Sequence, residues 1–411
     1  MKFRDYDVDK DQAAVRRMWR EVGWIEEDEK DQQGLDHFIA SGAAIVADVA
    51  GEAECMVCTA PGSVRYLDED LPFSCVTAVT TSHVARKQGL AKNLTAAAVA
   101  AGAAEGAVIS GLGMFEQGYY DQLGFGTGGY ENIISFDPAL LTVSVKPGVP
   151  CRLSVDDWEA VHANRLGRSR GHGACNLSAA AFTRAQMIWT KGGFGLGYKN
   201  EDGEGLSHHA WFSTEGSGIG PYGVQWLVYR DAAQFLELMA LIKNLGDQVR
   251  LVKTLEPPGI QLQDLLRQPF RTSYVTRQSK FENVMRALAF WQMRILDLPA
   301  CLARTHLACG DVRFNLELSD PIEGVLDDDA PWHGVAGEYV VTLGPASGAE
   351  VGRDDSLPTL VASVNAFTRM WLGVLPATSL AITDELAGPP DLLETLDVVL
   401  RLPDPKPDWD F

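Results

Sequence analysis

Apolar and polar positions over residues 1–136 predict a mixed α/β domain. Apolar side chains at helical spacing follow Asp11 and end near Gly23, which indicates an amphipathic helix. The stretch AAIVADVAGEAECMVCTAP (43–61) is apolar on both sides of Gly51, which is typical of a β-hairpin. Between them, the acidic run 26–31 predicts a solvated loop.

The same region continues with alternating strands and helices. An apolar run over 73–81 leads through a glycine-containing turn into an alanine-rich helix that ends near Ala104. A short strand (107–112), a short helix around Tyr119–Tyr120 and the strand-like YENIISF (130–136) follow. This order of elements is that of one α/β domain.

A second unit of the same kind occupies the middle of the chain, after prolines and a glycine at 145–150 that predict a domain boundary. Its strand, helix and strand are predicted at GVQWLVYR (223–230), DAAQFLELMALIKNLG (231–246) and QVRLVKTL (248–255). Asp231 and Gln234 are typical of a helix start, and Gly246 of a helix end. The unit resembles the first domain without its glycine turn, and we interpret the two as related.

The pattern changes again after RILDLPACLART (294–305). Strands are predicted at 312–319, where Val312, Phe314, Leu316 and Leu318 face one side, and at 337–344 and 359–373. Two helices are predicted at 376–387 and 391–400. The expected fold is therefore α/β (α+β) and multidomain, with domains at 1–145, 146–292 and 293–411.

Length and charge narrow the function. A chain of 411 residues is too long for a single core. Its net charge of −20 makes nucleic acid a poor partner, because neutralising phosphates needs a basic surface, and it favours cationic ligands. Residues 1–10 lack the apolar core of a signal peptide, and 94–115 is too polar for a membrane span. We therefore expect a cytoplasmic protein without membrane insertion.

The cysteines do not predict a metal site. Cys55 and Cys58 have the CxxC spacing but lie on a predicted strand, where residues three apart point to opposite faces. We interpret them as two small core residues. The eight histidines form no HExxH-like pair.

The stretch VTTSHVARKQGLAKNL (79–94) carries the chemistry. A strand ends, a basic loop follows, and a helix begins after Gly89. The first N–H groups of a helix are free to bind an anion, and Gly89 and Ala91 leave room for it. Arg86, Lys87 and Lys92 concentrate positive charge at this end. A surface helix is the alternative, but cations at a helix N-terminus oppose its dipole. We therefore predict a phosphate site.

Arg86-x-x-Gly89-x-Ala91 at a strand-to-helix junction resembles the pyrophosphate loop of GCN5-related N-acetyltransferases (GNAT). The segment GYYDQLGFGTG (118–128) resembles the place where these enzymes have a catalytic tyrosine. A GNAT domain, a second GNAT-like domain without the motif and a sterol-carrier-protein-like third domain resemble the enhanced intracellular survival (Eis) family. RILDLPACLA (294–303) and the ending WDF resemble that family's third domain.

The resemblance covers the whole chain and implies mixed, largely antiparallel sheets, acetyl-CoA as co-substrate, amine acceptors such as aminoglycosides, and a hexameric homo-oligomer. It implies Tyr120 as general acid and the terminal carboxylate of Phe411 as general base. It also implies a CoA site made by Val79, Thr80, Thr81, Arg86, Lys87, Gly89, Leu90 and Ala91. No metal is implied.

An acceptor pocket is expected near Trp24 and Asp28, with Asp410 attracting a cationic amine; a plain solvated loop at 24–31 is the alternative. Two positions depart from the family pattern: Thr81-Ser82-His83 replaces Val-x-Pro, and Phe115 replaces a small polar residue. Tyr119, next to Tyr120, is expected to be a core residue.

Two other functions remain open at this point. The same fold could acetylate protein lysines or use another acyl donor. The third domain could instead bind lipid, with the GNAT domains as a non-catalytic scaffold.

Overall fold

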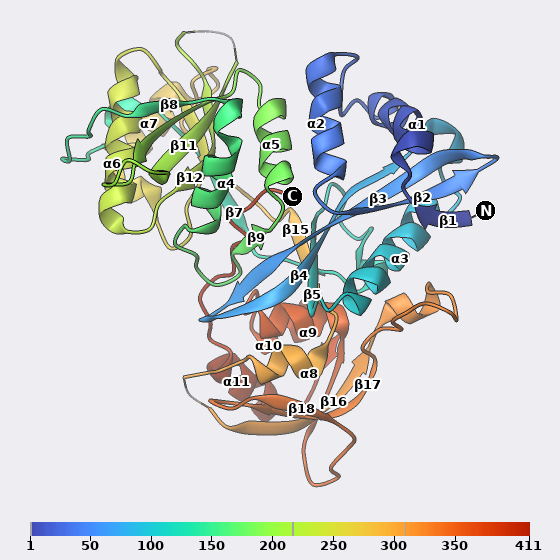
Figure 1. Ribbon diagram of the computed structural model, residues 1–411. Coiled ribbons are helices and arrows are strands. Elements are labelled where there is room, and N and C mark those ends of the chain that lie inside the picture. Colours follow the sequence, from blue (N-terminus) through green and yellow to red (C-terminus); the bar gives the residue numbers. More distant parts are fainter. Residues whose placement is uncertain (1, 216–217, 309) are drawn as a thin grey trace.

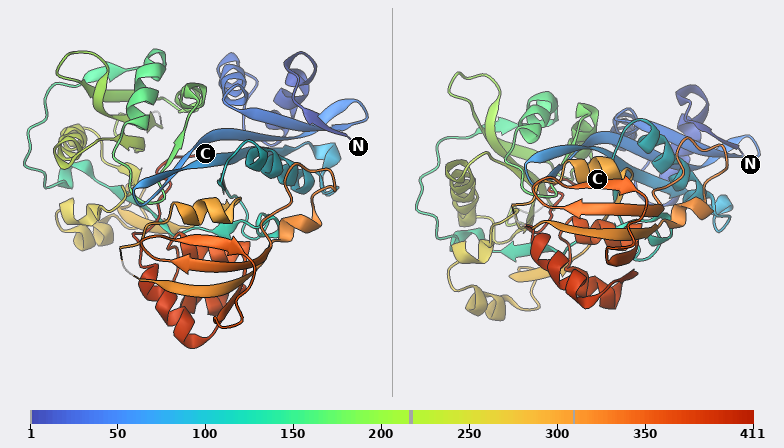
Figure 2. Two further views of the ribbon diagram at one scale, coloured as in Figure 1. Left: turned by 60° about the horizontal axis from the view of Figure 1, so that its bottom comes forward. Right: turned by 90° about the horizontal axis from the view of Figure 1, so that it is seen from below.

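A computed structural model describes the protein at residues 2–215, 218–308 and 310–411. Three β-sheets with their helices form three bodies, and the C-terminus lies between the first and the second (Figure 1). The third body packs beneath the first, as two further views show (Figure 2). The predicted mixed α/β fold is confirmed.

The first sheet has the order β1-β2-β3-β4-β5-β15-β6, and β9 pairs with β3. Its strands are β1 (Lys2–Asp5), β2 (Ala43–Val49), β3 (Glu52–Tyr66), β4 (Glu69–Thr81), β5 (Ile109–Gly113), β6 (Gly126–Thr127), β9 (Cys175–Leu177) and β15 (Trp291–Ile295). Helices α1 (Val8–Glu21) and α2 (Glu29–Ile39) pack on one face and α3 (Leu90–Ala104) on the other. The predicted hairpin at Gly51 and the strand and helix at 73–104 are confirmed.

The second sheet has the order β14-β7-β13-β12-β11-β10-β8. Its strands are β7 (Glu131–Phe136), β8 (Cys151–Leu153), β10 (Phe194–Lys199), β11 (Leu206–Thr214), β12 (Tyr222–Val228), β13 (Val252–Leu255) and β14 (Val284–Leu288). Its helices are α4 (Trp158–Leu166), α5 (Ala180–Trp189), α6 (Ala232–Asn244) and α7 (Pro269–Thr276). The predicted unit β12-α6-β13 is confirmed, and the Asp231 side chain caps α6 as expected.

The third sheet has the order β18-β17-β16-β19-β20. Its strands are β16 (Val312–Ser319), β17 (Gly337–Leu343), β18 (Gly348–Val351), β19 (Thr359–Ser363) and β20 (Leu386–Ala387). The helices of this part are α8 (Leu298–Ala303), α9 (Val364–Trp371), α10 (Ala377–Thr383) and α11 (Pro390–Val399). Phe314, Leu316 and Leu318 face its core, as the alternation predicted.

Two sequence expectations for local structure are wrong. The run 26–31 is not only a loop, because the Asp28 side chain accepts a hydrogen bond from the Asp31 backbone and α2 begins at Glu29. The segment 359–373 is not one strand, because the Ser363 side chain caps a helix that starts at Val364. In both places a side-chain cap starts a helix within a segment whose composition indicated something else.

Sheet membership does not follow the order of the chain. Strand β7, which the sequence grouped with the first domain, lies in the second sheet between β13 and β14. Strand β15, which follows the second unit, lies in the first sheet between β5 and β6. The domain boundaries at 145 and 292 stay a prediction, and the exchanged strands tie the first two bodies together.

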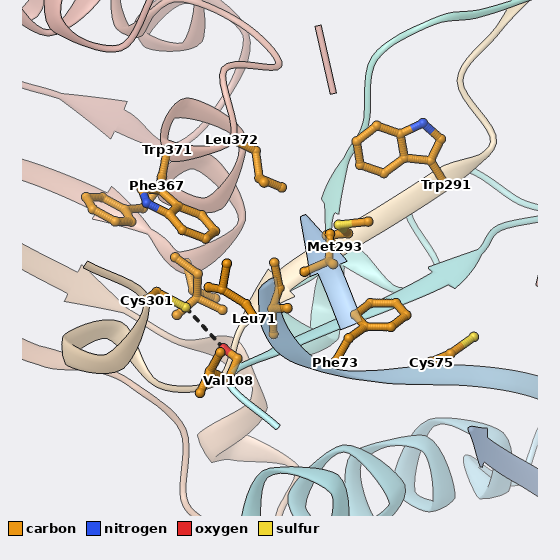
Figure 3. Close-up of a cluster of buried hydrophobic side chains, with 14 of the residues drawn as sticks. Leu71, Phe73, Cys75, Val108, Trp291, Met293, Cys301, Phe367, Trp371 and Leu372 are labelled. Carbon is orange, nitrogen blue, oxygen red and sulfur yellow. Dashed lines mark hydrogen bonds between the residues drawn. The ribbon is translucent and has the colours of Figure 1, made fainter. Parts of the chain in front are cut away.

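The first and third bodies share one apolar core. Leu71 and Phe73 of β4 and Met293 of β15 cluster with Phe367 and Trp371 of α9 (Figure 3). All five side chains are buried. The third body is therefore packed against the first rather than tethered to it.

Cys55 and Cys58 are buried in different core clusters on opposite faces of the first sheet, as predicted. Cys309 lies outside the described residues. Over 2–215, 218–308 and 310–411, no helix combines the length and the apolar character that crossing a membrane requires.

Candidate active site

A cavity of about 770 Å³ opens where β4 ends and α3 begins. All eight residues expected to bind CoA line it. The full lining is Val22, Trp24, Val79, Thr80, Thr81, Ala85, Arg86, Lys87, Gly89, Leu90, Ala91, Lys92, Phe115, Glu116, Tyr119 and Gln122. The structure thus brings together in one wall the positions that the sequence motif singled out.

The start of α3 is built to bind an anion. Gly89 precedes the helix with φ of 77°. It has no side chain to cap the helix, so no capping side chain accepts hydrogen bonds from the first-turn N–H groups. A Cβ at Gly89 would meet only Asn93 Nδ2, at 4.0 Å, but the left-handed conformation of the residue favours glycine. Arg86 and Lys87 are exposed, and in the described parts of the chain neither takes part in an ion pair. The residues present therefore fit a polyphosphate.

Strand β4 separates from β5 beside this cavity. The two strands pair from Phe73 to Val76, and the pairing stops there. A bulge follows, since Cys58 pairs with Thr77 but Met56 with Thr80, and Ala78 has φ of 55°. The bulge turns the end of β4 away, so its backbone groups are free to hydrogen-bond an extended ligand between the strands.

The two neighbouring tyrosines occupy different places. Tyr119 is half-buried and lines the cavity, whereas Tyr120 is only 2% exposed and is not among the lining residues. Tyr120 packs in the core cluster that contains Leu112 and Leu94, on the α3 side of the first sheet. Burial raises the pKa of both phenols, so both are protonated at neutral pH. Neither hydroxyl has a hydrogen-bond partner among the described residues.

The C-terminal tail runs extended between the first and second bodies (Figure 1). Its backbone pairs with residues 172–175: Lys406 donates to the His172 carbonyl at 3.0 Å, and the Pro407 carbonyl accepts from Cys175 at 2.7 Å. Arg168 holds Asp408 twice, through Oδ2 at 2.7 Å and the carbonyl at 2.8 Å. The tail is therefore a fixed part of the structure.

Trp409 anchors the last turn of the tail. Its ring is 7% exposed, and the Arg165 guanidinium lies 3.8 Å from the ring centroid. Burial, together with the neighbouring Arg168, lowers the pKa of Arg165 to about 9. One residue further, the Asp410 carbonyl accepts a hydrogen bond of 2.9 Å from Gln186.

Phe411 ends the chain at the open end of β5. Its ring lies 5.9 Å from that of Phe73. A Cβ built on Gly113 would be 2.7 Å from the Phe411 main-chain oxygen, so the terminal carboxylate lies directly over Gly113. A Cβ built on Gly111 would lie 2.9 Å from the Phe73 ring and 3.2 Å from Met293. The carboxylate and Phe73 thus share one face of β5, whereas Leu112 and Tyr120 lie on the other.

A smaller cavity of about 260 Å³ lies beside the tail on the second body. Its lining includes the carboxylates Glu256, Asp408 and Asp410 and the aromatic rings of Trp189, Trp226, Tyr229 and Trp409, as well as Arg165. Part of this lining is already engaged within the protein: the Arg165 guanidinium lies 4.2 Å and 3.8 Å from the centroids of the Trp226 and Trp409 rings, and Arg168 binds Asp408.

The residues expected to bind the acceptor are dispersed. Trp24 is 47% exposed and lines the larger cavity, where it packs edge-on against Trp19. Asp410 lines the smaller one, and the surrounding chain raises the pKa of its carboxyl by desolvation. Asp28 caps α2 and lines neither cavity.

Sequence reasoning missed three functional candidates near the tail. Arg165 and Arg168 lie on α4 and just after it, and Glu131 is the first residue of β7. Burial raises the pKa of Glu131 to about 7; Lys406 opposes this and Asp408 and Asp410 add to it. The arginines carried no local signal for this role, because the tail residues that they contact are 240 or more residues away.

Comparisons with known proteins agree with this geometry. A family described as an acetyltransferase (GNAT) domain matches residues 4–128. A comparison with curated proteins found no match. Residues 4–128 are therefore an acetyltransferase domain of the GNAT type, and the prediction of an enzyme of this class is confirmed.

Several solved structures resemble the whole chain. Eis1 from Mycobacterium abscessus is 15% identical, covers 100% of both chains and has a TM-score of 0.77. A GCN5-related N-acetyltransferase from Kribbella flavida is 18% identical, covers 100% of this chain and 98% of its own, and has a TM-score of 0.75. One from Anabaena variabilis is 13% identical, covers 100% of both and has a TM-score of 0.79. At these identities the likeness shows a shared fold, consistent with tandem GNAT-like domains.

Proposed function

We propose that this protein transfers the acetyl group of acetyl-CoA to a primary amine of a cationic small molecule, such as an aminoglycoside or a polyamine. The observation that carries the proposal is the cavity at the start of α3, where every residue of the predicted CoA motif lines one wall. Val79, Thr80 and Thr81 would hold the extended arm of CoA through the separated end of β4. Arg86, Lys87, Gly89, Leu90 and Ala91 would hold its pyrophosphate.

The proposed chemistry needs a base and an acid on opposite sides of the reacting carbonyl. An alkyl amine is mostly protonated at neutral pH and must lose a proton before it attacks the thioester. The carboxylate of Phe411 would accept that proton. As the new C–N bond forms and the C–S bond breaks, the hydroxyl of Tyr120 would donate a proton to the departing sulfur. Their positions on the two faces of β5 support these roles.

A cationic acceptor is supported by Asp410 and Glu256 in the lining of the smaller cavity. Arg168 already pairs with Asp408, the third carboxylate there. Asp410 and its neighbours would attract the amine before transfer. Trp24 lies at the other cavity and Asp28 at a helix cap. We therefore place more of the acceptor contacts on the tail than on residues 24–31.

Thiol release from acetyl-CoA with a panel of amines tests this proposal. Tyr120→Phe and a chain lacking Phe411 should each lower turnover on the order of 100-fold, the effect of losing a general acid or base. Wild-type turnover in both variants would rule out the assigned roles. Circular dichroism and thermal melting should show that both variants remain folded.

Tyr119 is a second candidate for the acid, because its ring lines the cavity whereas that of Tyr120 does not. Tyr119→Phe, made in parallel, separates the two. The proposal predicts a large loss for Tyr120→Phe and a small one for Tyr119→Phe. The reverse order would move the acid by one residue.

Four other assignments remain proposals. The sterol-carrier-like nature of the third domain and a hexameric assembly rest on the resemblance to the Eis family. The cytoplasmic location and the exclusion of nucleic acid as a partner rest on the hydropathy and the net charge of the sequence. Mass photometry at several concentrations tests the assembly. Protein-lysine acetylation would appear as acetylated peptide without small-amine turnover, and a lipid-binding scaffold as tight lipid binding without thiol release.

A further inference from the structure

The turn that carries Tyr120 is held in place by the third body. The turn consists of Tyr120, a short 3-10 helix at Asp121–Leu123, Gly124, Phe125 and the two residues of β6. Tyr120 is its N-terminal residue, and the N–H groups of Leu123 and Phe125 donate to the Tyr120 carbonyl at 2.9 Å and 3.4 Å. A displacement of this turn would therefore also displace the backbone of Tyr120.

Asn365 of α9 makes the most direct contact. Its side-chain amide donates to the carbonyl of Asp121 at 2.9 Å and to the carbonyl of Phe125 at 2.9 Å. One NH₂ group thus joins the two ends of the turn. The contact crosses from the third body to the first, over a sequence separation of 240 residues or more.

A buried ion pair holds the middle of the same turn. Arg294 of β15 and Asp320, which follows β16, are both fully buried, with 2.6 Å between Nη2 and Oδ2. The other guanidinium nitrogen, Nη1, donates to the carbonyl of Leu123. Asp320 is itself fixed, since its Oδ2 accepts from the Val335 backbone at 3.0 Å and its Oδ1 from Ile322 at 3.2 Å.

Packing leaves the turn little freedom between these contacts. Gly124 has φ of 81°, and a Cβ there would be 2.7 Å from both Arg294 Nη1 and Val364 Cγ1. Gln292 adds a hydrogen bond of 2.7 Å to the Asp121 carboxylate. Residues from the third body and from β15 therefore enclose the turn on several sides.

We propose that the third body positions the catalytic tyrosine, with Asn365 as the positioning residue that it supplies. The inference rests on the proposed role of Tyr120. Buried ion pairs add little net stability but specify geometry, which is what a catalytic turn requires. A displacement of about 1 Å at a reacting group can cost on the order of 100-fold in rate. The third body then has a role in catalysis beyond carrying the C-terminal carboxylate.

A purely structural role for Asn365 is the competing interpretation, and the chain offers a matched control. Asn315 of β16 makes the same kind of contact inside the third body: its amide donates to the carbonyls of Asp354 at 2.8 Å and Leu357 at 3.2 Å. It does not touch the Tyr120 turn. Asn315 is buried and Asn365 is half-buried, so loss of the amide should affect stability at both positions but the turn at only one.

The experiment compares Asn365→Ala and Asn365→Asp with Asn315→Ala in thiol-release kinetics and thermal melting. Both Asn365 variants should lower kcat by about tenfold or more, with KM for acetyl-CoA changed by less than about threefold. Asn365→Asp keeps the shape of the side chain but places a carboxylate oxygen, which cannot donate, next to two carbonyl oxygens. If this variant unfolds, Asn365→Ala alone tests the proposal. Asn315→Ala should lower the melting temperature and keep kcat. Wild-type kcat in Asn365→Ala would overturn the proposal.

A double-mutant cycle with Tyr120→Phe separates positioning from general stability. Where Asn365 acts through the Tyr120 hydroxyl, adding Asn365→Ala to Tyr120→Phe should cause less than about a twofold further loss. The full loss in that background would overturn this inference alone and leave Tyr120 as the acid. Wild-type turnover in Tyr120→Phe itself would remove the acid assignment, and the positioning role with it.

Discussion

At the scale of single residues, Gly113 leaves space beside β5 for the main-chain oxygen of Phe411. It is the last residue of β5, and the Phe411 oxygen occupies the space that a side chain would need. Real Cβ atoms do not approach other atoms to 2.7 Å, so either the strand end or the carboxylate would have to move. Glycine at this position therefore allows the terminal carboxylate to reach the opening between β4 and β5.

Gly113→Ala should accordingly lower kcat by about tenfold to 100-fold, because it displaces the proposed base. KM for acetyl-CoA should change little, since the loop proposed to bind its pyrophosphate lies at the start of α3. Gly129→Ala is the control, because a Cβ there meets nothing within 4 Å. Steady-state kinetics of the two variants check the prediction, and equal turnover in both would contradict it.

The buried carboxyl of Glu131 is expected to make the stability of the fold depend on pH. It is 8% exposed, and burial raises its pKa from 4.5 to about 7. A carboxyl whose pKa is raised on folding stabilises the fold below about pH 4.5, and this contribution is lost as the pH rises through about 7. This shift of the pKa from 4.5 to about 7 corresponds to about 3 kcal/mol of folding free energy at most.

Glu131→Gln, which stays neutral at every pH, should therefore raise the melting temperature relative to wild type, and by more at pH 8 than at pH 5. Differential scanning fluorimetry at the two values checks this. Comparing variant with wild type at each pH cancels the other groups that titrate in this range. An equal difference at pH 5 and pH 8 would show that the carboxyl titrates normally.

At the scale of elements, the tail acts as a strap between the first and second bodies. Prolines at 403, 405 and 407 keep it extended, and Arg168 holds it at Asp408. The strap has no helix or strand of its own, so its position depends on these side chains and on the backbone hydrogen bonds with His172 and Cys175.

Arg168→Gln should thus free the tail and lower kcat at least about tenfold, approaching the effect of removing Phe411. Arg170→Gln serves as the control, because Arg170 binds Asp70 at 2.6 Å and, among the described residues, forms no hydrogen bond or ion pair with the tail. Kinetics, together with limited carboxypeptidase digestion of the tail, check the expectation. Full activity of Arg168→Gln with a protected tail would show that the other contacts suffice.

Elements also show what sequence could predict. The strand, loop and helix at 79–94 were predicted correctly because their signals are local: a strand end, Gly89 and a helix start lie within a few residues. The turn to a helix at Val364 was missed, because an apolar run gives the same pattern for a strand and for a buried helix. The roles of Arg168 and Asn365 could not be predicted, since their partners are distant in sequence.

At the scale of the molecule, the three bodies meet at one site. The first supplies the cavity proposed to bind CoA, the second holds the tail, and the third supplies the tail and contacts the Tyr120 turn through Asn365. The exchange of β7 and β15 between sheets was beyond prediction from one sequence, because strand pairing over long separations has no local signal. Because of these exchanges, neither the first nor the second sheet is formed by one continuous segment of the chain.

A fusion added after Phe411 should consequently abolish turnover, because it converts the terminal carboxylate into an amide and adds bulk over Gly113. The same fusion before Lys2 should leave turnover within about twofold, since β1 lies at the far edge of the first sheet. Melting temperatures should stay close in both. An active C-terminal fusion would reduce the tail to a packing element.

The central claim is acetyl transfer from acetyl-CoA to an amine at this site, and mass spectrometry of the acceptor tests it most directly. Acetyl-CoA carrying a labelled acetyl group is incubated with the protein and a panel of polyamines and aminoglycosides. We predict labelled acetyl on an amino group with wild type, and on the order of 100-fold less with the chain that lacks Phe411. Labelled product formed equally by both chains, or by neither with any amine, would contradict the account.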